Sequence, residues 1–120
     1  VQSFLDVHNY LRQSISAGNF TAKSKLMPPS RDPIPNLVWN CELEQRAQTH
    51  ANRCKYEHSQ RLDNLGENMY MTWSSHKISI GGQGNASSNS WANEFQEHGW
   101  SNIQFTMSVY NSGVAHATQV

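Results

Sequence analysis

The stretch that bears most directly on the fold is Gly113-Val114-Ala115-His116-Ala117-Thr118-Gln119-Val120. Its composition is typical of a β-strand, and the turn-forming run Asn111-Ser112-Gly113 would connect it to an earlier strand. A strand needs neighbours, so any chemistry that involves His116 depends on residues upstream. We also expect the sheet to be incomplete where the sequence stops at Val120.

Three helices are expected upstream of this stretch, because apolar residues recur at helical spacing over residues 2–17, 40–54 and 87–98. Asn40 is a suitable N-cap for the second helix, and Gly99 is a suitable end for the third. The expected buried stripe of the third helix consists of Trp91, Ala92 and Phe95.

Two more strands are predicted from alternating apolar residues, one within 65–73 and one over 105–109. Four prolines make residues 26–36 an extended connection, and the Ser- and Gly-rich run 74–88 is expected to be loose. Helices mixed with a few neighbouring strands indicate an α+β fold. At 120 residues, the chain is expected to form a single domain over 1–120.

The charge balance and the hydropathy pattern exclude two classes of function. Lys and Arg together number 9, as do Asp and Glu, so the formal net charge is zero and we expect no nucleic-acid partner. No apolar run approaches the ~20 residues that span a bilayer, so we do not expect a transmembrane protein. The start at Val1 carries no signal segment, which is consistent with a chain that is already processed.

Two acceptor motifs for N-glycosylation indicate an extracellular protein. They are Asn19-Phe20-Thr21 and Asn85-Ala86-Ser87, and both lie in polar stretches that we interpret as exposed loops. Such tripeptides also arise by chance in a chain rich in Ser and Asn.

The two cysteines, Cys41 and Cys54, lie at either end of the second predicted helix. In one continuous helix, 54 − 41 = 13 residues span about 19.5 Å, whereas a disulfide requires Cα atoms within about 7 Å. We therefore expect that they do not pair with each other. Each is either a free buried thiol or has a partner outside this segment.

Two histidines and two glutamates form the candidate site: His58, Glu67, Glu94 and His116. Two imidazoles could bind Zn²⁺, with water at the open positions and the carboxylates orienting the ligands or acting as bases. The alternative is that the four are separate hydrogen-bonded or solvated residues. Of the other histidines, we expect His8 and His50 at the edge of the core, and His76 and His98 in solvent.

A series of motifs in this order resembles the CAP superfamily, which comprises the cysteine-rich secretory proteins, antigen 5 and the pathogenesis-related 1 proteins. The motifs are Val7-His8-Asn9-Tyr10-Leu11-Arg12, the helix with Trp39, Leu43 and Ala47, Glu57-His58-Ser59, Gly66-Glu67-Asn68-Met69, Trp91-Ala92-Asn93-Glu94 and Gly113-Val114-Ala115-His116-Ala117-Thr118-Gln119. The segment at Met27-Pro28 and the helix between the cysteines are most similar to secreted venom-allergen-like members from nematodes.

The resemblance implies an α-β-α sandwich with a cleft that carries a tetrad formed by His58, Glu67, Glu94 and His116. It implies that the histidine pair can hold a divalent cation, commonly zinc, beside the glutamates. It also implies that Cys41 and Cys54 pair with later cysteines, which this sequence does not contain. The first-helix residues His8, Asn9 and Arg12 are interpreted as residues that shape the fold.

The sequence departs from the family pattern after the last motif. Ala115 stands where Gly or a charged residue is usual, and Ala117 replaces the commoner aromatic residue. The tryptophan and the cysteine-bearing strands that follow in the family are absent, so the domain is expected to be incomplete at its C-terminal end.

Two functions from different classes follow. The first is a secreted, non-enzymatic binding module that engages an extracellular or host partner, or carries a sterol or fatty acid, with a divalent cation held weakly at the tetrad. The second is a metal-assisted, protease-like hydrolase in which Glu67 or Glu94 is the general base. We favour the first, because two histidines without a third evident protein ligand would hold zinc weakly. The oligomeric state stays open.

Overall fold

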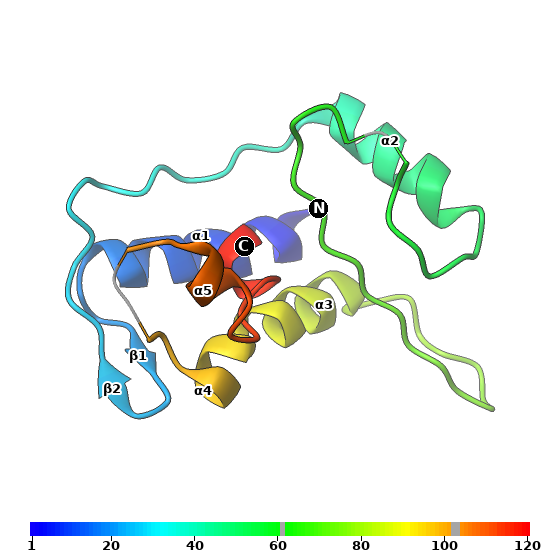
Figure 1. Ribbon diagram of the computed structural model, residues 1–120. Coiled ribbons are helices and arrows are strands. Elements are labelled where there is room, and N and C mark those ends of the chain that lie inside the picture. Colours follow the sequence, from blue (N-terminus) through cyan, green and yellow to red (C-terminus); the bar gives the residue numbers. More distant parts are fainter. Residues whose placement is uncertain (61, 102–103) are drawn as a thin grey trace.

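The structure is a computed structural model that describes residues 1–60, 62–101 and 104–120 (Figure 1). Its elements, in chain order, are α1 (Gln2–Ser16), β1 (Thr21–Ala22), β2 (Lys25–Leu26), α2 (Cys41–Ala51), α3 (Gln83–Ala92), α4 (Glu94–His98), α5 (Met107–Tyr110) and the 3₁₀-helix η1 (Ala117–Gln119). Strands β1 and β2 form a small antiparallel sheet in which Thr21 lies opposite Leu26. Helices together with this sheet confirm the predicted α+β class.

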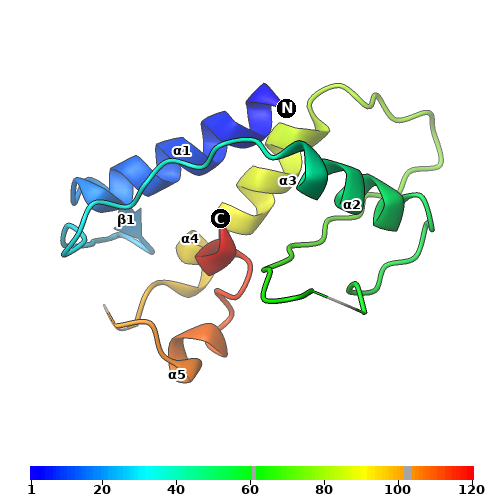
Figure 2. The same cartoon turned by 90° about the horizontal axis from the view of Figure 1, so that it is seen from above.

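The core forms where α1, α3, α4 and the C-terminal segment meet, and α1 and α3 lie side by side in both views (Figures 1 and 2). Gly84 allows this close approach, because a Cβ atom there would lie 2.8 Å from the ring of Phe4 on α1. Phe95 stacks on Trp100 with ring centroids 4.7 Å apart. Among the described residues, the buried apolar ones are Leu11, Ala22, Met27, Phe95, Val109, Val114, Ala117 and Val120.

The first-helix motif holds the proline-rich connection against α1, which agrees with the expected role of its residues in shaping the fold. The Asn9 side chain accepts a hydrogen bond from the N–H of Leu37 (2.7 Å) and donates one to its carbonyl (3.1 Å). Arg12 donates to the carbonyl oxygens of Pro35 (2.7 Å) and Val120 (3.1 Å), so it joins residues far apart in the sequence. His8 is half-buried and bonds the Phe4 carbonyl through Nδ1 (2.7 Å).

Helix α2 begins as expected, because the Asn40 side chain accepts hydrogen bonds from the N–H groups of Glu42 (2.9 Å) and Leu43 (3.1 Å). It ends at Ala51, earlier than predicted, and Cys54 follows with a positive φ of 53°. The helix buries none of its residues and lies beside the main helical layer (Figure 1).

Both cysteines are free and exposed. The expectation that they do not pair with each other agrees with the structure, whereas the alternative of buried thiols was wrong. The physical reason is that Cys41 opens a helix that buries no residue, and Cys54 lies in the exposed turn after it.

The three predicted strands, two from alternation and one from composition, were wrong. Residues 65–73 form no strand in the described structure, since no second segment forms a hydrogen-bonded ladder with them. The last three residues of the run 105–109 belong to helix α5 instead, because the Thr106 hydroxyl caps this helix at the N–H of Val109. The closing stretch 113–120 turns into η1, held by a bond from the N–H of Thr118 to the Val114 carbonyl (3.0 Å).

The third predicted helix exists but starts earlier. It begins at Gln83, with Gly82 as its N-cap in the left-handed region (φ 83°), and breaks at Asn93 into α3 and α4. The expectation of a loose run 74–88 was therefore wrong for its last part. Asn85 lies in α3 and not in a loop, although it is exposed, whereas Asn19 lies in an exposed connection as predicted.

Helices α1 and α2 enclose an apolar groove of about 580 Å³. Its walls include Phe4, His8, Trp39, Leu43 and Trp91. Within the described ranges, no helix has both the length and the apolar character needed to cross a membrane.

Candidate functional site

The first half of the candidate site is a bond between His58 and Glu67. His58 Nδ1 lies 2.8 Å from Glu67 Oε1, and the same oxygen accepts a bond from the Ser59 N–H at 2.9 Å. The Ser59 hydroxyl donates to the other carboxylate oxygen. Because an ionised carboxylate only accepts, His58 Nδ1 carries a hydrogen, and in the neutral form of the ring Nε2 then keeps its lone pair.

These contacts set the charge state of Glu67. Partial burial raises the pKa of its carboxyl group, but the bonds from the Ser59 hydroxyl, the Ser59 N–H and His58 together outweigh burial and lower it. The charge of His50 lowers the Glu67 pKa further. Glu67 is therefore a stable anion near neutral pH.

The second half repeats this arrangement with His116 and Glu94. His116 Nδ1 lies 2.6 Å from Glu94 Oε1, and Glu94 Oε2 accepts a bond from the Ala117 N–H at 3.0 Å. Glu94 is the first residue of α4, so the break after α3 gives its side chain the direction that reaches the closing segment. The carboxylate thus fixes both the ring and the backbone of the histidine segment.

The two halves are joined by the segment that carries Glu67. Asn68 donates through Nδ2 to the His116 carbonyl (2.9 Å), and Trp91 donates through Nε1 to the Met69 carbonyl (3.0 Å). Gly66 lies against the amide of Gln119, which would be 2.0 Å from a Cβ atom at that position. The residues on both sides of Glu67 therefore contact the segment that carries His116.

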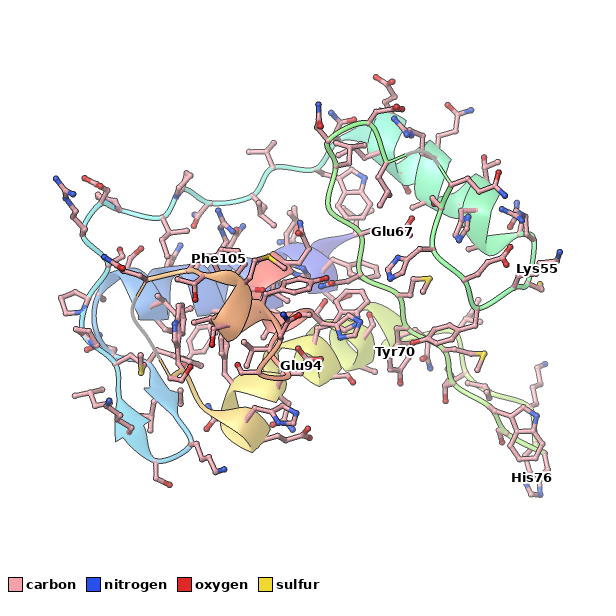
Figure 3. All side chains as sticks on the ribbon, viewed as in Figure 1. Lys55, Glu67, Tyr70, His76, Glu94 and Phe105 are labelled. Atoms are coloured by element: carbon pink, nitrogen blue, oxygen red, sulfur yellow. The ribbon has the colours of Figure 1, made fainter. Side chains whose placement is uncertain are left out.

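Figure 3 shows Glu67 on the loop after α2 and Glu94 where α4 begins, both on the inner part of the molecule. A pocket of about 770 Å³ between α2 and this loop is lined by Glu67, Ser59 and Arg46, among others, whereas Glu94 and His116 lie outside its lining. In the described part of the chain, no group of three or more His, Cys, Asp or Glu is placed to hold a metal ion. A single cleft shared by all four residues stays a prediction.

Three residues of the site were quoted within motifs but received no role from the sequence. Ser59 supplies two donors to Glu67, Asn68 joins the two halves, and Gln119 packs on Gly66. The sequence feature that could have pointed to these three residues is their position, since each lies within three residues of a candidate ligand. Closeness along the sequence does not show which group each of these residues contacts in the folded chain.

Comparison with known proteins places the chain in a family. The sequence profile of the cysteine-rich secretory protein (CAP) family matches residues 5–120. Ancylostoma secreted protein from Ancylostoma caninum is 35% identical over 99 residues, which cover 81% of this chain and 23% of that protein. Cysteine-rich secretory protein 3 from Homo sapiens is 31% identical, over 99% of this chain and 42% of its own length.

Solved structures agree with the sequence matches. The crystal structure of NaASP2 with Zn²⁺ superposes with a TM-score of 0.85 at 30% identity, over 98% of this chain and 63% of that chain. The structure of Na-ASP-1 gives 0.83 at 31% identity, over 98% and 31%. The chain thus spans less than two thirds of these relatives. The match over nearly all of its residues shows that the chain belongs to the CAP family, with the fold of these neighbours.

Proposed function

We propose that this chain is a secreted, non-enzymatic CAP-type binding module, a single domain over residues 1–120, in which His58 and His116 hold a divalent cation such as zinc. One observation carries the proposal: each histidine is bonded through Nδ1 to a glutamate, at 2.8 Å for Glu67 and 2.6 Å for Glu94. In metal sites, such carboxylates fix the histidine tautomer and leave Nε2 to the metal.

The donor set fits zinc, although it does not make a strong site. Imidazole nitrogen is a good zinc ligand, and the two glutamates support the ligands from behind. Since two histidines are fewer than the three or four protein ligands of usual zinc sites, water would complete the coordination and the ion would be weakly held. The crystal structure of a relative, NaASP2, was determined with Zn²⁺.

The hydrolase alternative has less support. A general base works best with a pKa near the working pH, whereas the contacts of Glu67 lower its pKa. Both oxygens of Glu67 and both oxygens of Glu94 already accept hydrogen bonds within the chain. We therefore assign these carboxylates a positioning role.

Lipid carriage is a second candidate function, favoured by the groove between α1 and α2. Its volume of about 580 Å³ and its aromatic and aliphatic walls suit the apolar body of a sterol or a fatty acid. Displacement of a fluorescent sterol and of a fluorescent fatty acid would test it, with Ala47→Trp in the groove wall expected to abolish binding. Unchanged binding in that variant would refute the groove as the lipid site.

An extracellular location fits the relatives, one of which is named a secreted protein. The exposed Asn19 and Asn85 suit glycosylation, and the exposed Cys41 and Cys54 suit disulfides with cysteines outside residues 1–120. Intact mass before and after glycosidase treatment of protein made in a secretory host would test the two acceptor sites. An unshifted mass would refute both.

Calorimetric titration with zinc tests the main proposal. We expect one weak site that is lost in His58→Ala and in His116→Ala, while His76→Ala, at the exposed tip of the loop before α3, keeps it. Unchanged zinc binding in both site variants would refute the shared site. For the hydrolase alternative, a peptide and ester screen should give no turnover that depends on Glu67 or Glu94. Turnover lost in Glu67→Gln or Glu94→Gln would establish that alternative instead.

A further inference from the structure

The two acceptor motifs for N-glycosylation lie in different local structures. Asn19-Phe20-Thr21 leads into strand β1, whereas Asn85-Ala86-Ser87 lies inside helix α3. In Figure 1, β1 lies beyond the C-terminal end of α1, and α3 runs alongside α1. Both asparagines are exposed, so exposure alone does not distinguish the two sites.

Glycan transfer requires both ends of such a motif. The oligosaccharide moves from a lipid diphosphate to the asparagine: the bond from its first carbon to a diphosphate oxygen breaks, and a bond to Nδ2 forms. Nδ2 gives one proton to a base of the transferase, and the lipid diphosphate leaves. Because the motif also specifies a hydroxyl group two residues later, the transferase has to reach the amide and this hydroxyl from the same side.

In α3, the amide and the hydroxyl of the motif point in different directions. An α-helix turns by about 100° per residue, so residues two apart lie about 200° apart around its axis. Asn85 is exposed, whereas Ser87 is only 5% exposed. The Ser87 hydroxyl donates to the carbonyl oxygens of Gln83 (2.9 Å) and Gly84 (3.2 Å). The hydroxyl of this motif is therefore closed off by the helix that contains it.

Packing of α3 on α1 holds this arrangement in place. Ser88, the residue after the motif, is 0% exposed, and its hydroxyl donates to the Gly84 carbonyl (2.7 Å). Gly84, the residue before the motif, lies so close to α1 that a Cβ atom there would be 2.7 Å from the Ser3 hydroxyl oxygen. The motif is thus held on both sides, and access to the Ser87 hydroxyl requires α3 to unwind.

The motif at Asn19 has the opposite arrangement. Phe20 packs edge-on against Phe95, with ring centroids 5.5 Å apart, and the Met27 N–H donates to the Phe20 carbonyl (2.8 Å). In an extended chain, successive side chains alternate between faces, so the neighbours of Phe20 lie on the face away from Phe95. Asn19 and Thr21 are both exposed, as this alternation requires. The folded chain therefore presents the amide and the hydroxyl of this motif together.

We propose that the folded chain accepts a glycan at Asn19 and not at Asn85, so that a glycan on Asn85 is attached only before α3 forms. In a cell, transfer to Asn85 then competes with the folding of α3, whereas transfer to Asn19 does not. The proposal rests on the extracellular location proposed above for this cellular setting. The difference between the two motifs is a property of the folded chain itself.

Glycan transfer to the purified, folded chain tests the proposal. The chain is made without glycans and incubated with an oligosaccharyltransferase and a lipid-diphosphate oligosaccharide, and peptide mass mapping measures the occupancy of each asparagine. We expect occupancy at Asn19 to exceed that at Asn85 at least about tenfold, because only the small fraction of molecules with an open α3 reacts at Asn85. Since no secretory route is involved, this result does not depend on whether the extracellular location is correct.

Two substitutions at the exposed Asn89 separate the helix from its side-chain contacts. Asn89 donates through Nδ2 to Asn85 Oδ1 (2.6 Å) and to the Asn85 carbonyl (2.8 Å). Asn89→Pro removes a helical N–H and clashes with the carbonyl four residues earlier, so it should raise Asn85 occupancy at least about tenfold. Asn89→Ala removes the side-chain bonds alone and should leave Asn85 closed.

Hydrogen exchange over residues 83–92 shows in which variants α3 is open. Ser88→Lys opens α3 by a second route, because it places a charge at a buried position, and it should also raise Asn85 occupancy. Ser90→Lys is its matched control, because Ser90 lies on the same helix and is exposed. Occupancy at Asn19 should stay high in all four variants.

Several results would overturn the proposal. Similar occupancy of the two asparagines in the folded wild type would do so, and so would a folded chain that reacts at neither. An equal rise at Asn85 in Asn89→Ala and Asn89→Pro would show that the side-chain bonds, and not the helix, close the motif. If Asn85 stays unmodified in a variant whose α3 is open by hydrogen exchange, the helix is not the barrier.

Discussion

Glu94→Gln separates the charge of the carboxylate from its shape at the better buried of the two histidine–glutamate pairs. Glutamine offers one acceptor and one donor, whereas Glu94 accepts from both His116 Nδ1 and the Ala117 N–H. If the amide oxygen keeps the Ala117 bond, the amide nitrogen faces His116 Nδ1. That contact forces the ring into the other tautomer, with the hydrogen on Nε2.

The size of the effect follows from the burial of the pair. A hydrogen bond to a charged group contributes about 1.5–3 kcal/mol and a neutral one about 0.5–1.5 kcal/mol. Glu94 is 18% exposed, but His116 is 37% exposed, so solvent screening favours the low end of the difference. We expect the free energy of unfolding to fall by about 1 kcal/mol, which lowers Tm by about 3–6 °C in a domain of this size.

Chemical denaturation measures the free energy of unfolding. Zinc calorimetry measures the affinity for zinc, which depends on whether His116 Nε2 has a free lone pair. With the hydrogen on Nε2, zinc affinity should fall by about tenfold or more. Glu97→Gln is the control, because Glu97 lies on the same helix α4 and is exposed, and its carboxylate contacts its own neighbours Asn93 (2.8 Å) and His98 (3.8 Å) instead of the closing segment. If Glu94→Gln matches both the wild type and this control in stability and in zinc affinity, the positioning role of Glu94 is refuted.

Three further predictions concern the frame around the site. Gly84→Ala should destabilise the protein by about 1–2 kcal/mol, because the clash with Phe4 exceeds the gain in helix propensity. The control Ser90→Ala, on the exposed side of α3, should be neutral or stabilising. A Gly84→Ala variant more stable than the wild type would contradict the packing of α1 on α3. Because the pKa of Glu67 is lower in the folded state, its ionised carboxylate adds to the free energy of unfolding above the ordinary glutamate pKa. This contribution is lost as pH falls through the lowered pKa of the folded state. Stability measured over an acid pH series should show the loss in the wild type and not in Glu67→Gln. Asn40→Ala should cost about 1 kcal/mol in urea unfolding through loss of the α2 cap, and no change would mean that α2 contributes little to global stability.

The sequence predicted the features that depend on neighbours along the chain. Helix α1, the Asn40 cap and the stop at Gly99 are set by spacing and by capping chemistry within a few residues, and all were confirmed. Alternation was a poor guide to strands, because 65–73 and 105–109 have strand-like patterns but no ladder to join. In 105–109, the Thr106 cap makes a helix instead.

The sequence by itself determined the family and predicted the four candidate site residues, since motif order is a property of the chain. Only the tertiary structure decided how they combine: His58 with Glu67 and His116 with Glu94, joined through Asn68. It also decided that the closing stretch around His116 is a turn and a 3₁₀-helix. The physical reason is that a side-chain partner or a strand partner is supplied by distant segments, whereas a motif specifies only its own residues.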